Sequence, residues 1–195
     1  MAWDTARTRQ ALLDAAVDEF AEHGFDGARI DRVGKRAGVN KERIYQYFGN
    51  KEKLFGYVLE AELDRIASTI PVTVEQAADL GDYAGRLYDY HRARPQFIRL
   101  LHWEGLRDTG AALQEPGRTA TYGARVEALA QAQRDGTLDP SLDPKALFYA
   151  VLALGAWWFS VPQAVRMIFG GEQAPQTERD ALIGLVRRLA GQDGS

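Results

Sequence analysis

Apolar residues recur three or four positions apart along almost the whole chain, and no stretch alternates strictly between apolar and polar residues. The first spacing places apolar side chains on one face of an α-helix, whereas strict alternation would favour a β-strand. The pattern predicts an all-α fold with helices over residues 5–22, 30–37, 41–48, 51–69, 74–93, 96–107, 118–134, 144–160 and 177–190. Prolines, glycines and short polar clusters predict loops over residues 108–117, 135–143 and 170–175.

The second predicted helix is short and amphipathic. Ile30, Val33 and Ala37 share one face of it, so they mark the side that packs against a core. Gly38 follows directly and can adopt the positive φ that ends a helix and reverses the chain. Asn40 is a favoured N-cap for the next helix. These residues predict two short helices joined by a tight turn.

The third predicted helix exposes a polar face. Ile44 and Phe48 lie one turn apart and form its buried stripe, which leaves the remaining side chains in solvent. These exposed residues are Lys41, Glu42, Arg43, Tyr45 and Gln46. They supply the donors and acceptors that read base edges when a short helix enters a major groove. The pair of helices therefore predicts a helix-turn-helix that binds DNA, although many glycine-joined helix pairs bind no nucleic acid.

Local charge favours the DNA-binding interpretation. The whole chain has a formal net charge of -3, yet residues 29–53 contain eight basic and three acidic side chains, a local excess of five positive charges. A basic region on an acidic protein is what the neutralisation of DNA phosphates requires.

The segment from Thr8 to Leu59, TRQALLDAAVDEFAEHGFDGARIDRVGKRAGVNKERIYQYFGNKEKLFGYVL, resembles the N-terminal DNA-binding domain of the tetracycline-repressor (TetR) family of bacterial transcription regulators. The resemblance runs in order through the alanine-rich first helix, RAGV, IYQYF and NKEKLF, and covers about a quarter of the chain. It implies a three-helix DNA-binding domain over residues 1–55, followed by a larger helical ligand-binding and dimerisation domain over residues 56–195. It also implies a homodimer on an inverted-repeat operator, and a repressor that a small molecule releases from DNA.

Carried over by position, the resemblance makes residues 41–47 the recognition helix. Tyr45 and Tyr47 then occupy positions of phosphate or base contacts, and Lys51 occupies that of a lysine that meets the DNA backbone. The alternatives are that Tyr47 packs against the first helix and that Lys51 is an ordinary surface lysine.

The chain also departs from the family pattern. A hydroxyl residue commonly begins the second helix, whereas this chain has Arg29 there, whose charge is expected to replace the missing phosphate contact. Gly34 replaces the usual alanine, which either weakens the helix by about 1 kcal/mol or permits closer approach of the third helix. Glu42 and Arg43 replace small residues; arginine binds guanine, while glutamate accepts from cytosine or pairs with Gln46.

The C-terminal part is rich in aromatic residues spread over several helices. Such residues usually form a core, and they also line apolar ligand cavities. Together with the resemblance, this supply predicts a site for a small, mostly apolar molecule. The candidate ligand-binding residues are Phe97, His102, Trp103, Tyr122, Phe148 and Trp157.

Two C-terminal helices are candidates for the dimer interface. Residues 144–160 are apolar on nearly every side, so this helix must be covered all round, and the last helix carries an apolar stripe. The resemblance implies that both helices pair with their twins, whereas the alternative is that they only close the core of one protomer. The candidate interface residues are Trp157, Trp158, Leu182, Leu185, Val186 and Leu189.

Little in the sequence supports catalysis. The chain has no cysteine, its three histidines lack metal-ligand spacing, and it has neither HExxH nor GxSxG nor a phosphate-binding glycine loop, so we expect no enzyme, metal or cofactor. It has no signal-peptide pattern and no run of about 18 apolar residues, so a cytoplasmic protein without a membrane partner is expected. The competing hypothesis is a small all-α ligand-binding or enzymatic protein whose helix-turn-helix is structural.

Overall fold

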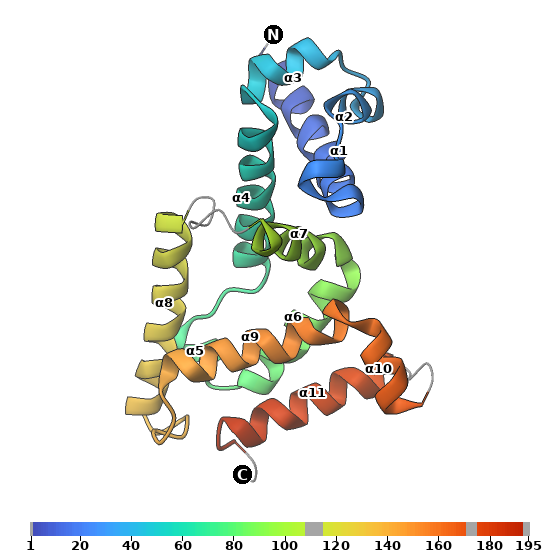
Figure 1. Cartoon of the computed structure of the whole chain (residues 1–195). Coiled ribbons are helices and arrows are strands. Elements are labelled where there is room, and N and C mark those ends of the chain that lie inside the picture. The colour runs from blue at the N-terminus through green and yellow to red at the C-terminus, as the bar shows by residue number, and fades with distance from the viewer. Residues whose placement is uncertain (1, 108–114, 171–174, 193–195) are drawn as a thin grey trace. The chain divides into compact units, whose positions relative to one another are not determined.

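The computed structural model describes residues 2–107, 115–170 and 175–192, with no side-chain description before residue 5. Within these ranges the secondary structure is helical, without strands. The helices are α1 (Ala2–Gly27), α2 (Ile30–Ala37), α3 (Lys41–Phe48), α4 (Lys51–Thr69), α5 (Val74–Ala77), α6 (Leu80–Ala93), α7 (Pro95–Leu106), α8 (Glu115–Arg134), α9 (Pro144–Ser160), α10 (Pro162–Phe169) and α11 (Pro175–Leu189) (Figure 1). The all-α prediction is confirmed.

The chain divides into two compact units. The N-terminal unit comprises Met1–Arg65 and Gln96–Glu115, and the second unit comprises Ile66–Pro95 and Pro116–Ser195. Helix α7 therefore belongs with the N-terminal helices, although it follows α6 of the second unit in the chain. The expected functional domains, residues 1–55 and 56–195, stay a prediction.

The N-terminal unit is built around an apolar core between α1, α2, α3, α4 and α7. Phe20 is fully buried and its ring centroid lies 4.9 Å from that of Phe55, which is also fully buried. Ile44 and Phe48 attach α3 to this core, and Leu100 brings α7 to it. The predicted buried stripe of the third helix is thus confirmed.

The second unit is built around α6, α9 and α11, which lie side by side (Figure 1). Gly155 of α9 allows this close packing, because a Cβ atom there would lie 2.6 Å from a methyl group of Leu87 in α6. Helix α11 presents Leu182 and Val186, both fully buried, to this core. Two ion pairs also tie α11 to α6. Arg179 pairs with Asp89 of α6 at 2.8 Å, and Arg187 pairs with Asp79, the residue that precedes α6, at 2.8 Å.

The predicted helices over residues 30–37, 41–48, 51–69 and 144–160 have the same bounds as α2, α3, α4 and α9. Helix α1 extends beyond the predicted residues 5–22, from Ala2 to Gly27, and consists of two helical segments that meet at a kink, since Gly24 (φ 69°, ψ -179°) has non-helical backbone angles. Helix α8 begins at Glu115 rather than at residue 118, and α7 and α11 are shifted by one or two residues. Of the loops expected over residues 108–117 and 170–175, residues 108–114 and 171–174 lie outside the described residues, whereas residues 115–117 belong to α8 and Pro175 begins α11.

Two predictions along the second unit were wrong. The single helix expected over residues 74–93 is two helices, because the carboxylate of Asp79 accepts the backbone N–H of Asp82 and caps a new helix there. Helix α10 was missed because Pro162 was taken only as the end of the preceding helix. Proline also suits the first position of a helix, where its missing N–H has no partner to lose.

No single helix in the described ranges has the length and apolarity needed to cross a membrane. Helices α9 and α10 pass this test only as a pair, which is bent by 86°.

Candidate nucleic-acid interface

A tight turn joins α2 to α3. Gly38 takes the left-handed conformation (φ 68°, ψ 30°), as predicted, and the N–H of Val39 donates to the carbonyl oxygen of Gly34 at 2.9 Å. A Cβ atom at Gly34 would lie 2.6 Å from the carbonyl oxygen of Val39 and 3.4 Å from Ile44 Cδ1. The absence of a side chain at Gly34 therefore lets α3 and the turn approach α2 closely, which is one of the two interpretations offered for this glycine.

Helix α3 combines a buried anchor with an exposed polar face. Ile44 and Phe48 keep 1% and 2% of their surface exposed. Five candidate DNA-binding residues on this helix face solvent: Lys41, Glu42, Arg43, Tyr45 and Gln46. Among the described residues, no hydrogen bond joins Glu42 to Gln46, so both side chains are available to a partner. Tyr47 is half-buried against the core, which favours the packing alternative for this residue.

The basic residues around α3 are held weakly or not at all. Lys41 pairs with Asp31 at 3.3 Å, and Arg36 with Asp18 at 3.5 Å, between side chains that are all at least 43% exposed. Exposed pairs of this kind contribute at most about 1 kcal/mol, so phosphate can replace the carboxylate. Within residues 29–53, the exposed cations that form no ion pair with another described residue are Arg29, Lys35, Arg43 and Lys53.

A buried carboxylate holds the start of α2. Glu19 of α1 is 1% exposed, and its Oε1 accepts the backbone N–H of Arg29 at 2.8 Å and Nε–H of Arg32 at 2.7 Å. Burial raises the pKa of Glu19, and the hydrogen bonds from Arg32 and from the Arg29 backbone outweigh burial, so its pKa lies below the ordinary value. Arg29 itself is the N-cap residue of α2, but its side chain forms no capping hydrogen bond.

Glu19 thus accepts from the N-cap backbone N–H, the contact that a glutamate at the third helical position makes in a capping box, and it does so from α1. Sequence reasoning missed this role. The available signal was an acidic residue on the apolar face of the first helix, one position before Phe20.

Lys51 is tied to the end of α1. Its Nζ donates to the carbonyl oxygen of Asp26 at 3.2 Å and lies 4.9 Å from the centre of the Phe25 ring. Lys51 is therefore more than an ordinary surface lysine, since it fastens α4 to the segment that follows the kink in α1. A role in meeting the DNA backbone stays a prediction for this residue.

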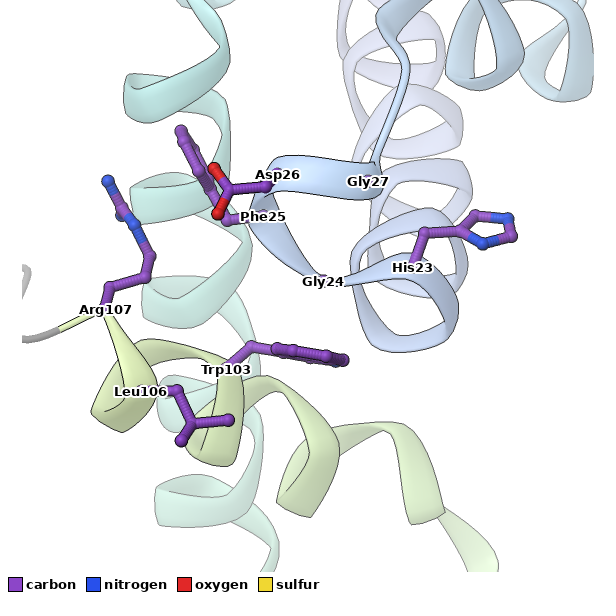
Figure 2. A pocket seen from close by; sticks show the side chains of 8 residues that line it. All are labelled: His23, Gly24, Phe25, Asp26, Gly27, Trp103, Leu106 and Arg107. Atoms are coloured by element: carbon purple, nitrogen blue, oxygen red, sulfur yellow. The ribbon is translucent and has the colours of Figure 1, made fainter.

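Helix α7 also fastens the kinked end of α1. The indole of Trp103 lies beneath Gly24 (Figure 2), so close that a Cβ atom there would be 2.9 Å from the ring, and its Nε1–H donates to the Ala21 carbonyl at 3.3 Å. Arg107 lies 3.7 Å over the centre of the Phe25 ring and pairs with Glu52 at 3.0 Å.

A pocket of about 600 Å³ lies at the same junction, lined by His23, Gly24, Phe25, Asp26, Gly27, Trp103, Leu106 and Arg107. In Figure 2 the Arg107 side chain lies toward Phe25 and Asp26, whereas His23 points away from them.

The six candidate ligand-binding residues do not all share one unit. Phe97, His102 and Trp103 belong to α7 in the N-terminal unit, whereas Tyr122, Phe148 and Trp157 belong to the second unit. The structure brings together Tyr122 and Phe148, whose ring centroids are 6.3 Å apart. Trp157 is 61% exposed. The ligand-binding role of these residues stays a prediction.

The six candidate interface residues differ in exposure. Leu182 and Val186 are fully buried within the protomer, on the face of α11 that packs in the core. Trp157 is 61% and Leu185 48% exposed, so their apolar surface remains available to a partner. Trp158 and Leu189 are half-buried.

The comparisons with known proteins identify the family. The sequence profile described as "Bacterial regulatory proteins, tetR family" matches residues 12–58, and the profile described as "Tetracyclin repressor-like, C-terminal domain" matches residues 79–188. The chain belongs to the TetR family.

Relatives of this TetR-family chain match it along nearly its whole length. The HTH-type transcriptional repressor SCO4008 of Streptomyces coelicolor is 37% identical over 188 residues, which are 95% of this chain and 96% of that protein. The HTH-type transcriptional regulator RutR of Escherichia coli K12 is 31% identical over 188 residues, 93% of this chain and 87% of that protein. The crystal structure of the transcriptional regulator SCO4942 from Streptomyces coelicolor superimposes with a TM-score of 0.81 at 35% identity, covering 93% of this chain and 97% of that one.

The family and these relatives are transcriptional regulators, not enzymes. The predicted family, fold class and function are confirmed: this TetR-family protein is a DNA-binding transcriptional regulator with a helix-turn-helix, and the names of its relatives support a repressor. Dimers and small-molecule ligands are typical of the family.

Proposed function

We propose that this TetR-family protein is a repressor that binds an inverted-repeat operator as a two-fold homodimer and leaves it when a small, mostly apolar ligand binds. The observation that carries the proposal is the exposed polar face of α3, which Ile44 and Phe48 hold on the core by its opposite side. Such a protein acts where the chromosome is, which in a bacterium is the cytoplasm.

Arg43 is the side chain on α3 best suited to reading a base. It is exposed and has no ion pair in the described chain, so binding DNA breaks no existing interaction of its guanidinium. The guanidinium fork matches O6 and N7 of guanine, whereas Lys35 on α2 is suited to contact phosphate as a point charge. Arg29, next to the Glu19-capped end of α2, is a second candidate for phosphate.

The apolar surface left on the second unit supports a dimer through α9 and α11. Trp157 and Tyr149 on α9 are 61% and 75% exposed, and Leu185 on α11 is 48% exposed. Large exposed apolar side chains that cluster mark interaction surfaces. Two recognition helices related by a two-fold axis then read half-sites about 34 to 36 Å apart, which requires an inverted repeat.

Helix α7 is suited to carry the ligand signal to the DNA-binding helices. The chain reaches α7 from α6 and leaves it toward α8, while Trp103 and Arg107 attach α7 to the end of α1 and to Glu52 of α4. A ligand that displaces α7 would therefore pull on the helices that position α3. Coupling between linked sites is typically about 1 to 3 kcal/mol, which corresponds to a 5- to 150-fold loss of operator affinity.

The DNA-binding proposal is tested by fluorescence anisotropy with labelled DNA from the region flanking the gene. We expect the logarithm of the affinity to fall with the logarithm of salt concentration, with a slope of about 0.9 for each phosphate neutralised. Arg43→Ala is expected to relax the preference at one base pair, at a cost of about 1 to 3 kcal/mol, and Lys35→Ala to weaken all sequences alike. Lys145→Ala, an exposed cation on α9, is the matched control. A salt slope near zero would contradict the proposal.

The dimer is tested by analytical ultracentrifugation of Trp157→Glu at micromolar concentration. A charge at this exposed position is expected to give a folded monomer with reduced operator affinity, because burying an unpaired carboxylate in an interface is strongly unfavourable. Val74→Glu, on α5 and 42% exposed, is the control. An unchanged dimer for Trp157→Glu would place the interface elsewhere.

A further inference from the structure

The second unit buries an arginine without a partner. Arg125 of α8 keeps 8% of its surface exposed. Within the described ranges, no carboxylate pairs with its guanidinium and no group forms a hydrogen bond with it. Three other arginines of this unit, each only partly exposed, form ion pairs: Arg86 with Asp82 at 2.9 Å, Arg179 with Asp89 and Arg187 with Asp79.

The guanidinium of Arg125 combines little exposed surface with some remaining contact with solvent, since none of its nitrogens is among the side-chain atoms that are fully buried without a partner. An anion can therefore reach it. An ion pair in such a mostly buried place is electrostatically stronger than one on the open surface, so this guanidinium is suited to bind an anion that a small molecule supplies.

The surroundings of Arg125 are aromatic and positively charged. Tyr83 of α6 is 1% exposed, and this burial raises the pKa of its hydroxyl. The guanidinium charges of Arg125 and Arg86 lie close enough to oppose that rise in part. Tyr122 lies one helical turn before Arg125 on α8, and its ring contacts Phe148 of α9. Three helices thus place a cation, a phenol and two further rings together.

We propose that the effector of this regulator is a carboxylic acid with an apolar or aromatic body, and that Arg125 binds its carboxylate. A guanidinium binds a carboxylate through two parallel hydrogen bonds, and Tyr122 and Phe148 provide apolar surface for the body of the molecule. The proposal rests on the proposed function, in which a small molecule controls operator binding, and adds the chemical class of that molecule.

The test compares carboxylic acids with their uncharged primary amides, which have nearly the same shape. The probes are benzoate and benzamide, 3-phenylpropionate and 3-phenylpropanamide, and octanoate and octanamide, added to the full-length protein. At 100 times its Kd, a bound acid is expected to raise Tm by roughly 5 to 10 °C, whereas its amide leaves Tm nearly unchanged. A panel in which no acid stabilises the protein more than its amide would overturn the proposal.

The variant Arg125→Met tests the role of the guanidinium directly. Since it replaces an unpaired buried charge with an apolar side chain of similar length, we expect a higher Tm without ligand and loss of the response to acids. Arg134→Met is the matched control, because Arg134 lies on the same helix, is exposed and pairs with Glu127, and it should leave the acid response intact. A lower Tm or failure to fold for Arg125→Met would show a structural role and overturn the proposal.

Operator binding separates this proposal from the proposed function. If amides release operator DNA as well as acids do, or if Arg125→Met still responds to the acids, the anionic class is wrong and ligand-controlled repression stands. If acids bind through Arg125 without changing operator affinity, the site is supported and the release mechanism fails.

Discussion

The carboxylate of Glu19 is the interaction on which the geometry of the helix-turn-helix most depends. It is 1% exposed and accepts hydrogen bonds from the Arg29 backbone at 2.8 Å and from the Arg32 side chain at 2.7 Å. Glu19→Gln keeps the size of the side chain and removes its charge. Both donors bind the same oxygen, Oε1, so the amide oxygen of glutamine can still accept from both, but it carries no negative charge to pair with the guanidinium of Arg32.

The expected loss is worked from these two contacts. A hydrogen bond to a charged group contributes about 1.5 to 3 kcal/mol, and breaking a fully buried ion pair costs about 3 to 5 kcal/mol. Arg32 is 41% exposed, so water takes over part of its solvation and the lower range applies. We expect Glu19→Gln to reduce the free energy of unfolding by about 1.5 to 3 kcal/mol. Operator affinity should also fall, because the start of α2 is held less firmly against α1.

Urea unfolding followed by circular dichroism measures the stability loss, and pH gives a second test. The pKa of Glu19 is lower in the folded than in the unfolded protein, so the unfolded state binds more protons as the solution becomes acidic. The difference between wild type and Glu19→Gln should be constant above the ordinary pKa of 4.5 and shrink as pH falls through the lowered value. Asp18→Asn, an exposed neighbour paired with Arg36 at 3.5 Å, should change stability by less than about 1 kcal/mol. Equal effects of the two variants would refute this reasoning.

Two further predictions concern packing and buried charge. Gly34→Ala should lower the free energy of unfolding by about 1 to 3 kcal/mol and weaken operator binding, because its methyl group overlaps the Val39 carbonyl oxygen. Gly123→Ala is the control: a Cβ atom there meets open space on α8, so this variant should raise the free energy of unfolding by up to about 1 kcal/mol. Thermal unfolding of both variants decides this, and similar effects would contradict it. Burial lowers the pKa of His91 from 6.5 to about 4, so the folded protein takes up this proton less readily than the unfolded chain. Wild type should therefore lose up to about 3 kcal/mol of stability as pH falls from 6.5 to 4, whereas His91→Phe should lose none of this contribution. Urea unfolding at several pH values measures both proteins, and parallel pH profiles would rule this out.

The helix-turn-helix could be predicted from the sequence because its determinants are local. The apolar spacing of Ile44 and Phe48 marks the buried side of α3, and Gly38 marks the turn, so the neighbouring residues alone define the element. The exposed face of α3 follows from the same geometry. The close approach that Gly34 permits could be named only as one of two alternatives, since it depends on where the Val39 carbonyl lies in space.

Interactions between residues distant in sequence could not be predicted in this way. Glu19 caps α2 ten residues away, and Trp103 donates to Ala21 across 82 positions, so no spacing rule connects them. Trp103 was expected to bind ligand because aromatic residues of the C-terminal part were treated as one set. The return of α7 to the N-terminal helices gives this indole a structural contact with α1, and its ligand-binding role stays a prediction.

The same distinction explains why Arg125 was missed. An arginine within a helix that carries many polar residues has the sequence pattern of a surface residue, and α8 is only weakly amphipathic, so periodicity does not separate its buried side from its exposed side. Tyr83 of α6 lies near Arg125, and Tyr122, one turn earlier on α8, contacts Phe148 of α9. The candidate DNA-binding residues of this chain lie on one short helix with a clear pattern, so the sequence alone could name them. The residues proposed to bind the ligand come singly from several helices, and their grouping became visible only in three dimensions.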